Sequence, residues 1–256
     1  MIILKSAQEI KAMRQAGVIL AKVLKALEAA VKPGITTKEL DLLAAELIAK
    51  AGCKASFLNY NGFPATLCIS VNEEVVHGIP DSRVLQEGDI VSIDGGVFYQ
   101  GYHSDSAITV PVGFVDEAKL KLLQVTKECL YLGIAQAVEG NRLSDISNAV
   151  QQHAERAGYS VVRDLVGHGI GKKLHEDPEI PNFGPPHRGP RLQSGMTLAI
   201  EPMINLGKYP VEVLENEWTI VTRDRLPSAH FEHTIVITPQ GPMILSQEQE
   251  ENDLLL

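Results

Sequence analysis

The sequence has few cysteines, no long apolar run and no excess of positive charge. Its three cysteines, Cys53, Cys68 and Cys129, form no C-x-x-C pair, so we predict a reducing compartment and no disulfide framework. No run approaches the roughly 18 apolar residues of a membrane span, and the N-terminus lacks the features of a signal peptide. We therefore expect a cytoplasmic protein that does not enter a membrane.

Negative charge exceeds positive charge, and the formal net charge at pH 7 is −9. Because the chain also has no basic run and no arginine-rich arm, we expect no specific nucleic-acid site. Apolar residues make up 45% of its 256 residues, which is enough for a sizeable core. The length fits one large domain or two small ones.

Helix and strand signals recur along the chain. Capping boxes at residues 6–9 and 36–39 predict two helices that end near Val31 and Gly52. A third helix is expected to begin at Asp116. The expected strands cover residues 67–71, 74–80, 91–94, 107–110, 161–168, 196–202, 218–221 and 230–237.

A weak internal repeat relates residues 34–52 to residues 140–158. Each segment contains an amphipathic helix, and the same offset of 106 residues relates Leu24 to Leu130. Chance similarity between two amphipathic helices is the alternative. We expect a single catalytic domain over residues 1–256 with similar halves at about 1–112 and 113–256, and a frayed tail at 247–256.

Two aspartates lie eleven residues apart in the segment 93–105. A turn at Gln100 and Gly101, followed by a return strand, predicts a hairpin that brings Asp94 and Asp105 roughly opposite each other. Two carboxylates at that distance repel unless a proton or a cation lies between them. The sequence therefore predicts a neutralising group beside this hairpin.

Five side chains at or near predicted strand ends can bind metals. They are Asp94, Asp105, His168, Glu201 and Glu232. Taken singly, Asp94 could be a turn former, Glu201 a solvated strand end and His168 a loop histidine. Glu232 differs, because it lies in an apolar run where burial of an unpaired carboxylate costs several kcal/mol.

Taken together, four carboxylates and one neutral imidazole carry a formal charge of −4, which two divalent cations would offset. An oxygen-rich set with one histidine suits Mn, Fe(II), Co or Zn. Two metals about 3.5–4 Å apart can share carboxylates and activate a water molecule for amide hydrolysis.

The order of these residues resembles the metallopeptidase family with the pita-bread fold. Within it, the chain is similar to the bacterial-type (type I) methionine aminopeptidases over nearly its whole length. The segments that carry the resemblance are 68–80, 167–171, 174–178, 197–202 and 231–234. It implies an α+β fold, in which a curved antiparallel sheet is covered by two pairs of helices and the halves are related by a pseudo-twofold axis.

The resemblance also implies a role for each metal-capable residue. Asp94 would chelate one of two divalent metal ions (Co, Mn, Fe(II) or Zn), and Asp105 and Glu232 would bridge both ions. His168 and Glu201 would bind the other ion, and Glu201 would also accept the proton of the attacking water.

The remaining site residues are likewise implied by the resemblance. His77 would face the substrate amine or the scissile nitrogen, and His175 would face the scissile carbonyl or the oxyanion. Without the resemblance, His77 could close a turn and His175 could cap one. A soft apolar pocket for the methionine side chain would include Tyr60, Phe63, Cys68 and Trp218, with His77 and His175 at its polar end.

The implied activity is removal of the N-terminal methionine from nascent proteins whose second residue is small, by attack of a metal-bridging hydroxide on the scissile amide. The implied partners are nascent polypeptide N-termini, with transient ribosome association, and the expected form is a monomer. One alternative is a proline-directed peptidase of the same fold, for whose extra N-terminal domain the motifs begin too early. The other is a non-catalytic binding protein, against which all five ligands and both histidines argue.

Three positions depart from the family pattern. Leu174 stands where many relatives carry phenylalanine, Asn61 where histidine is frequent, and Gly95 where valine is common. None is an expected metal ligand, so we expect the changes to affect the pocket wall and the hairpin.

Overall fold

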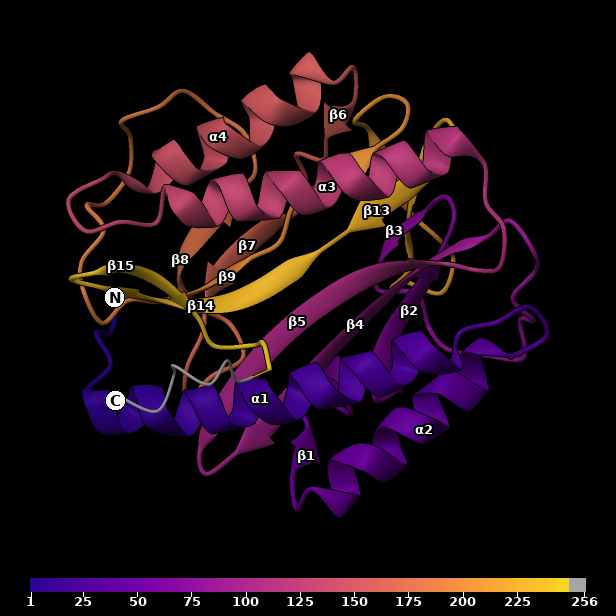
Figure 1. Ribbon diagram of the computed structural model, residues 1–256, viewed down its shortest axis with the longest axis horizontal. Helices are drawn as coiled ribbons and strands as arrows, with labels where there is room; N and C mark the ends of the chain where they lie inside the picture. The colour runs from indigo at the N-terminus through magenta and orange to yellow at the C-terminus, as the bar shows by residue number, and fades with distance from the viewer. Residues whose placement is uncertain (249–256) are drawn as a thin grey trace.

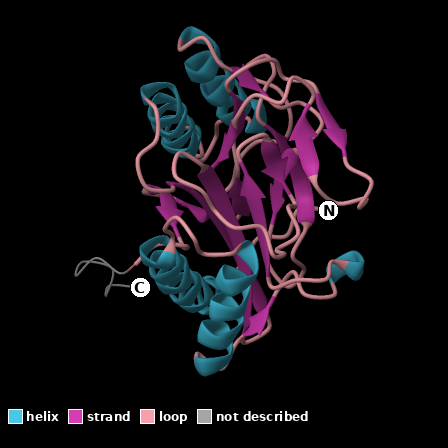
Figure 2. Ribbon diagram, turned by 90° about the vertical axis from the view of Figure 1, so that its right-hand side faces the viewer, coloured by secondary structure: helices cyan, strands magenta, loops and turns pink. Residues whose placement is uncertain are grey.

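Two pairs of helices cover one side of a curved antiparallel sheet in the computed structural model, which describes residues 1–248 (Figure 1). The helices are α1 (Ala7–Ala30), α2 (Thr37–Lys50), α3 (Glu117–Ala135) and α4 (Leu143–Arg156). α1 packs against α2 and α3 against α4, and Figure 2 shows both pairs on the same side of the strands. The predicted α+β fold is confirmed.

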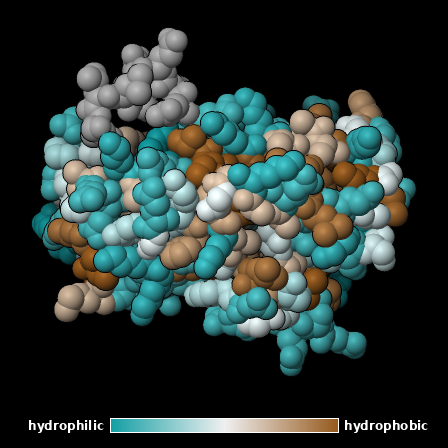
Figure 3. Space-filling view, turned by 90° about the horizontal axis from the view of Figure 1, so that it is seen from below, coloured by the Kyte–Doolittle hydropathy of each residue, from teal (hydrophilic) through white to brown (hydrophobic). Residues whose placement is uncertain are grey.

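The helices begin where the capping signals predict. Ser6 and Thr36 each accept a hydrogen bond from the backbone N–H of Glu9 or Glu39, whose side chain accepts one from the cap backbone in return. The side chain of Asp116 caps α3 by accepting a hydrogen bond from the backbone N–H of Lys119. Seen from below, the face over α1 and α2 is mostly polar with scattered apolar patches (Figure 3).

The strands form one large sheet and two small ones. They are β1 (Lys54–Ala55), β2 (Leu67–Val71), β3 (Glu74–Val76), β4 (Ile90–Tyr99), β5 (Tyr102–Pro111), β6 (Ser160–Val161), β7 (Val166–Gly169), β8 (Glu176–Pro181), β9 (Thr197–Ile200), β10 (Met203–Asn205), β11 (Val211–Val213), β12 (Ile220–Thr222), β13 (Ser228–His230), β14 (Glu232–Thr238) and β15 (Gly241–Ile244). The nine-stranded sheet has the order β1-β4-β5-β14-β9-β7-β8, with β2 beside β4 and β15 beside β14. The small sheets are β13-β10-β6 and β11-β12-β3.

Two predicted strands, 196–202 and 230–237, end or break where the chain changes sheet. The first ends as β9 at Ile200, and a separate strand, β10, begins at Met203, whereas the second is interrupted at Phe231 between β13 and β14. The breaks occur because the chain passes between sheets: β9 pairs with β14 in the large sheet, whereas β10 pairs with β13 in a small one. The two crossings therefore lie side by side.

Three other strand predictions were too long. The run 161–168 forms only β6 and β7 at its two ends, and the strand expected from residue 218 begins at Ile220. The strand expected over 74–80 is only β3, because His77 has a φ of +59°. That left-handed conformation does not continue a strand.

Two apolar clusters pack between the sheet and the helix pairs. Under α1 and α2 the cluster includes Leu20, Leu40, Ile69 and Ile93. Under α3 and α4 it includes Leu130, Ile146, Ile200 and Ile235. Each such side chain contributes about 1.5–3 kcal/mol by its burial, so the sheet is held from both ends. α4 begins and ends 106 residues after α2, as the internal repeat leads one to expect, and the division into two halves stays a prediction.

The cysteines, the helices and the C-terminal end bear on three further expectations from the sequence. All three cysteines are free thiols, which agrees with the predicted absence of a disulfide framework. Among residues 1–248, no helix is both long and apolar enough to span a membrane. The expected frayed tail, 247–256, lies outside the described residues from position 249 onward, while Glu248 forms an ion pair of 2.6 Å with Lys25.

Candidate metal centre

Asp94 and Asp105 lie on the two strands of the β4–β5 hairpin, which turns at Gln100 and Gly101 as predicted. The ladder pairs Asp94 with Ala107 and Gly96 with Asp105, so the two aspartates are diagonal neighbours, offset by two residues from direct opposition. Residues two apart on a strand share a face. Both carboxylates therefore point to the same side of the sheet.

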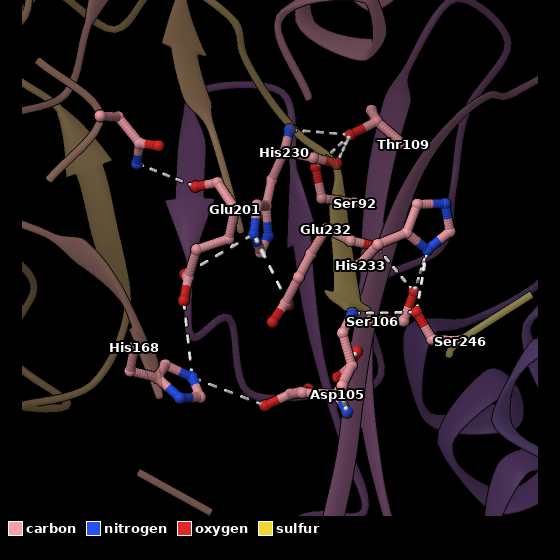
Figure 4. A network of polar contacts seen from close by, with 12 residues as sticks. Ser92, Asp105, Ser106, Thr109, His168, Glu201, His230, Glu232, His233 and Ser246 are labelled. Atoms are coloured by element: carbon pink, nitrogen blue, oxygen red, sulfur yellow. Dashed lines mark hydrogen bonds and ion pairs between the residues drawn. The ribbon is translucent and has the colours of Figure 1, made fainter. Parts of the chain in front are cut away.

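β14, β9 and β7 bring the other three predicted ligands to that place. Glu232 pairs with Ala107 of β5, and His168 pairs with Ala199 of β9. Glu201 is the first residue after β9. Asp105, His168 and Glu232 offer ligand atoms that all lie within 4.8 Å of one another. Figure 4 shows His168 and Glu201 facing Asp105 and Glu232 across this cluster. The structure thus brings together all five residues.

Burial controls the charge of the cluster. It raises the pKa of Asp94 to about 7, although a hydrogen bond with Asp105 acts in the opposite direction. It also raises the pKa values of Asp105, Glu201 and Glu232 well above the ordinary range, and repulsion among the carboxylates raises them further. One buried oxygen on each of Asp94, Asp105 and Glu232 has no hydrogen-bond partner among the described residues. Such a cluster needs protons or cations.

The orientation of the His168 imidazole bears on whether protons or cations neutralise the cluster. Its Nδ1 lies 2.8 Å from the carbonyl oxygen of Gly169, which can only accept, so Nδ1 carries the proton. Nε2 therefore presents a lone pair, 3.6 Å from Oε1 of Glu201 and 4.0 Å from Oδ2 of Asp105. A lone pair that faces two ionised carboxylates is repelled by both unless a cation lies between them. The residues present therefore fit divalent metal ions.

A cavity of about 190 Å³ opens beside the cluster. Besides the five metal-capable residues, it is lined by Phe57, Tyr60, Asn61, Phe63, Cys68, His77, Leu174, His175 and Trp218. All four predicted pocket residues are among them. Phe63 and Trp218 meet edge to face, with ring centroids 5.1 Å apart.

The cavity wall contains one residue that was not predicted, and it shows the surroundings of Cys68 and of two departures from the family pattern. Phe57 lines the cavity, yet nothing in the sequence separated it from an ordinary core phenylalanine. Burial raises the pKa of the Cys68 thiol well above its ordinary value, so Cys68 is an apolar wall residue. Leu174 and Asn61, two of the departures from the family pattern, also face the cavity.

Gly95, the third departure, lies in a tightly packed part of the hairpin. A Cβ atom at this position would lie 2.8 Å from Cδ2 of Leu67. A larger residue there would require Leu67 to move.

Both predicted catalytic histidines face the cavity. Burial lowers the pKa of His77 to about 4, and it also lowers the pKa of His175. The ring centroid of His175 lies 4.1 Å from that of His168, and its Nδ1 lies 2.8 Å from the hydroxyl of Tyr60. Both imidazoles are therefore neutral near pH 7 and can each donate one hydrogen bond.

His230, which was not predicted as a site residue, lies at the end of β13 and is 1% exposed. Its Nε2 lies 3.9 Å from Oε2 of Glu201 and 4.0 Å from Oε2 of Glu232. Burial lowers its pKa to about 3. Its position two residues before Glu232 was an available signal, since alternate residues of a strand share a face.

Comparison with known proteins agrees with this geometry. The sequence pattern of metallopeptidase family M24 matches residues 11–239. A methionine aminopeptidase from Clostridium perfringens is 56% identical over 246 residues, which cover 96% of this chain and 99% of that protein. A methionine aminopeptidase structure from Thermotoga maritima, 46% identical, has a TM-score of 0.96 and covers 97% of this chain and 100% of that one. A prolidase structure from Pyrococcus horikoshii, 23% identical, has a TM-score of 0.79 over 97% of this chain and 65% of that one, a likeness of fold alone.

Proposed function

The chain belongs to metallopeptidase family M24, and from that premise we propose that it is a metal-dependent aminopeptidase that removes N-terminal methionine. Its fold is the pita-bread fold that the sequence led us to expect. We further propose that it acts on nascent proteins whose second residue is small. The observation that carries the proposal is a buried cluster of four carboxylates and one imidazole lone pair beside a small, mostly apolar cavity.

Two divalent metal ions would be held by the five clustered residues, Asp94, Asp105, His168, Glu201 and Glu232. Charge balance supports two ions, because four carboxylates and a neutral imidazole carry a formal charge of −4. Mn, Fe(II), Co and Zn all suit this set of ligand atoms. When bound, the metal ions would polarise the scissile carbonyl and lower the pKa of a water molecule.

The protein's own groups would move and hold the protons. Glu201 lies beside the cavity, and with metal ions bound its carboxylate would be ionised and would accept a proton from the attacking water. His175, held at Nδ1 by Tyr60, would donate from Nε2 to the developing oxyanion. His77, whose neutral ring faces the same cavity, would bind the substrate amine or the scissile nitrogen.

The cavity supports an exopeptidase that takes one apolar side chain. Its volume of about 190 Å³ is smaller than the roughly 300–1,000 Å³ of a drug-sized ligand site. Aromatic edges from Phe63 and Trp218, together with the thiol of Cys68, suit a polarisable thioether. A methionine side chain would be bound by shape and sulfur contacts, with its amine toward the polar end.

The two alternative functions have less support. The prolidase likeness is one of fold only, whereas the identity to a methionine aminopeptidase is 56%. A metal-free binding protein would have no reason to bury four carboxylates together, since each uncompensated charge costs several kcal/mol.

Partners and location follow from the proposed activity. Nascent polypeptide N-termini would be the substrates, and they are met in the cytoplasm, with transient association with the ribosome. The net charge of −9 supports the absence of a specific nucleic-acid site. We propose that the protein acts as a monomer, which light scattering would check.

A peptide assay tests the proposed function. Metal-free protein, supplied with Mn²⁺ or Co²⁺, should release methionine from Met-Ala-X and spare Leu-Ala-X. Cleavage of X-Pro peptides instead would favour the proline-directed alternative. Folded protein without turnover on any of these peptides, with each divalent metal in turn, would favour the binding protein.

A further inference from the structure

His230 is a buried histidine whose ring has no hydrogen-bond partner. Both Nδ1 and Nε2 are inaccessible to solvent and unpaired among the described residues, and the residue is 1% exposed. A buried polar group without a partner costs about 1–3 kcal/mol. An imidazole in this position therefore needs a reason.

The backbone of His230 is held firmly. Its N–H donates to Oγ1 of Thr109 at 2.9 Å, and its carbonyl accepts from the same hydroxyl at 2.7 Å. The hydroxyl oxygen of Ser92 lies 2.9 Å from Oγ1 of Thr109, within hydrogen-bond distance. β13 also pairs with β10 at His230. The imidazole is thus carried by a well-anchored part of the chain.

The ring lies between two of the proposed metal ligands (Figure 4). Nε2 is 3.9 Å from Oε2 of Glu201 and 4.0 Å from Oε2 of Glu232. The other oxygen of Glu201, Oε1, faces His168 at 3.6 Å. The carboxylate of Glu201 is therefore bracketed by two imidazoles, one at each oxygen.

The two imidazoles have different chemistry toward this carboxylate. His168 offers a lone pair, because its proton is on Nδ1. His230 has no neighbour that fixes its tautomer, and a lone pair turned toward two carboxylates would be repelled. The tautomer with the proton on Nε2 is favoured, because that N–H can donate to either carboxylate.

We propose that His230 is a positioning residue of the metal centre. Its Nε2–H donates to the Oε2 atoms of Glu201 and Glu232 and leaves their remaining oxygens for metal ions. A movement of about 1 Å by either carboxylate shortens the separation to an ordinary hydrogen bond of about 2.9 Å. This inference rests on the proposed function, since it requires that Glu201 and Glu232 bind metal.

A direct metal-ligand role for His230 is the main alternative. The geometry favours the donor role, because His230 and His168 lie at opposite oxygens of Glu201. Among the described residues, Asp105, His168 and Glu232 offer ligand atoms that all lie within 4.8 Å of one another, and His230 is not part of this group.

Titration of metal-free protein with Mn²⁺ in a calorimeter tests the proposal. His230→Leu keeps much of the volume and removes the donor, and it should weaken Mn²⁺ binding about 10–100-fold, as loss of a group that orients a ligand does. His230→Gln offers an amide N–H at a similar reach, and it should bind Mn²⁺ within about threefold of the wild type. His233→Gln, on the other face of β14 against Tyr131 and Ser246, is the matched control and should bind like the wild type.

The outcomes separate the possible roles. If His230→Leu binds Mn²⁺ like the wild type, the proposal is wrong. If His230→Gln binds as weakly as His230→Leu, the donor role is wrong and His230 is a ligand. Thermal unfolding of the metal-free variants checks that each is folded, and His230→Gln still decides the matter if His230→Leu is not. If the folded wild type binds no divalent metal, the proposed function itself fails.

Discussion

The hydroxyl of Tyr60 lies 2.8 Å from Nδ1 of His175, so the pocket wall and a catalytic candidate form one hydrogen-bonded unit. Burial raises the pKa of Tyr60, and the nearby Asp105 raises it further, so the phenol keeps its proton. A protonated phenol can donate to Nδ1, which then leaves the imidazole proton on Nε2. With the phenol as donor, Tyr60 selects the tautomer in which His175 can stabilise an oxyanion.

Tyr60→Phe should therefore lower kcat with little change in KM for a Met-Ala-X peptide. The aromatic wall is retained and only the hydroxyl is lost, so we expect a reduction of about tenfold, below the 10²–10³ of a direct oxyanion donor. Steady-state kinetics measure it, with Tyr159→Phe as a control far from the cavity. An unchanged kcat would show that the tautomer of His175 does not depend on Tyr60.

His175→Ala should reduce turnover by about 10²–10³ while the bound Mn²⁺ content stays the same. The reason is that His175 is proposed to act on the substrate and not on the metal. Single-turnover kinetics and elemental analysis of the same sample give the two quantities. His153→Ala, on α4 beside Glu128 of α3 and not among the cavity-lining residues, is the control. Loss of metal from His175→Ala would contradict the assigned role.

Stabilisation by metal should depend on pH through the buried carboxyls. The folded protein raises the pKa of Asp94 to about 7. In metal-free protein, the stability that comes from this protonated carboxyl is complete below about pH 4 and is lost as the pH rises through about 7. Mn²⁺ binds the ionised form. The increase in Tm on adding Mn²⁺ should therefore grow between about pH 5 and about pH 8.

Calorimetric scans with and without Mn²⁺ across that range measure this increase. Asp94→Asn, which cannot ionise, serves as the comparison and should show a smaller pH dependence. A Tm increase that is the same at all pH values in the wild type would mean that the carboxyls do not carry protons in the metal-free state.

Removal of metal should loosen the β4–β5 hairpin at about pH 8. There Asp94, whose pKa burial raises to about 7, is mostly ionised, and its buried charge is unfavourable without a cation beside it. Backbone amides of residues 94–105 should exchange with deuterium faster in metal-free protein than in Mn²⁺-bound protein. Amides of α1 provide the internal reference, and equal protection of the hairpin in both states would rule out a metal-held hairpin.

Local patterns were enough to predict the framework of this protein. The capping boxes before α1 and α2, the turn at Gln100 and Gly101, and strand β2 depend on hydrogen bonds and side-chain periodicity within a few residues. The five metal-capable residues that stand out in the sequence also line one cavity, and their role as metal ligands stays a prediction. A carboxylate in an apolar run, such as Glu232, stands out by chemistry alone, because burying it requires a partner.

The tertiary structure alone decided where strands break and what fills the spaces between ligands. The breaks at Glu201 and Phe231 arise where β9 and β14 leave the large sheet for β10 and β13, and no local signal records a change of sheet. His230 reaches two carboxylates only because those crossings lie side by side. Tyr60 and His175 are 115 residues apart in sequence. Contacts of that kind depend on the packing of distant segments, which the periodicity of a single chain segment does not encode.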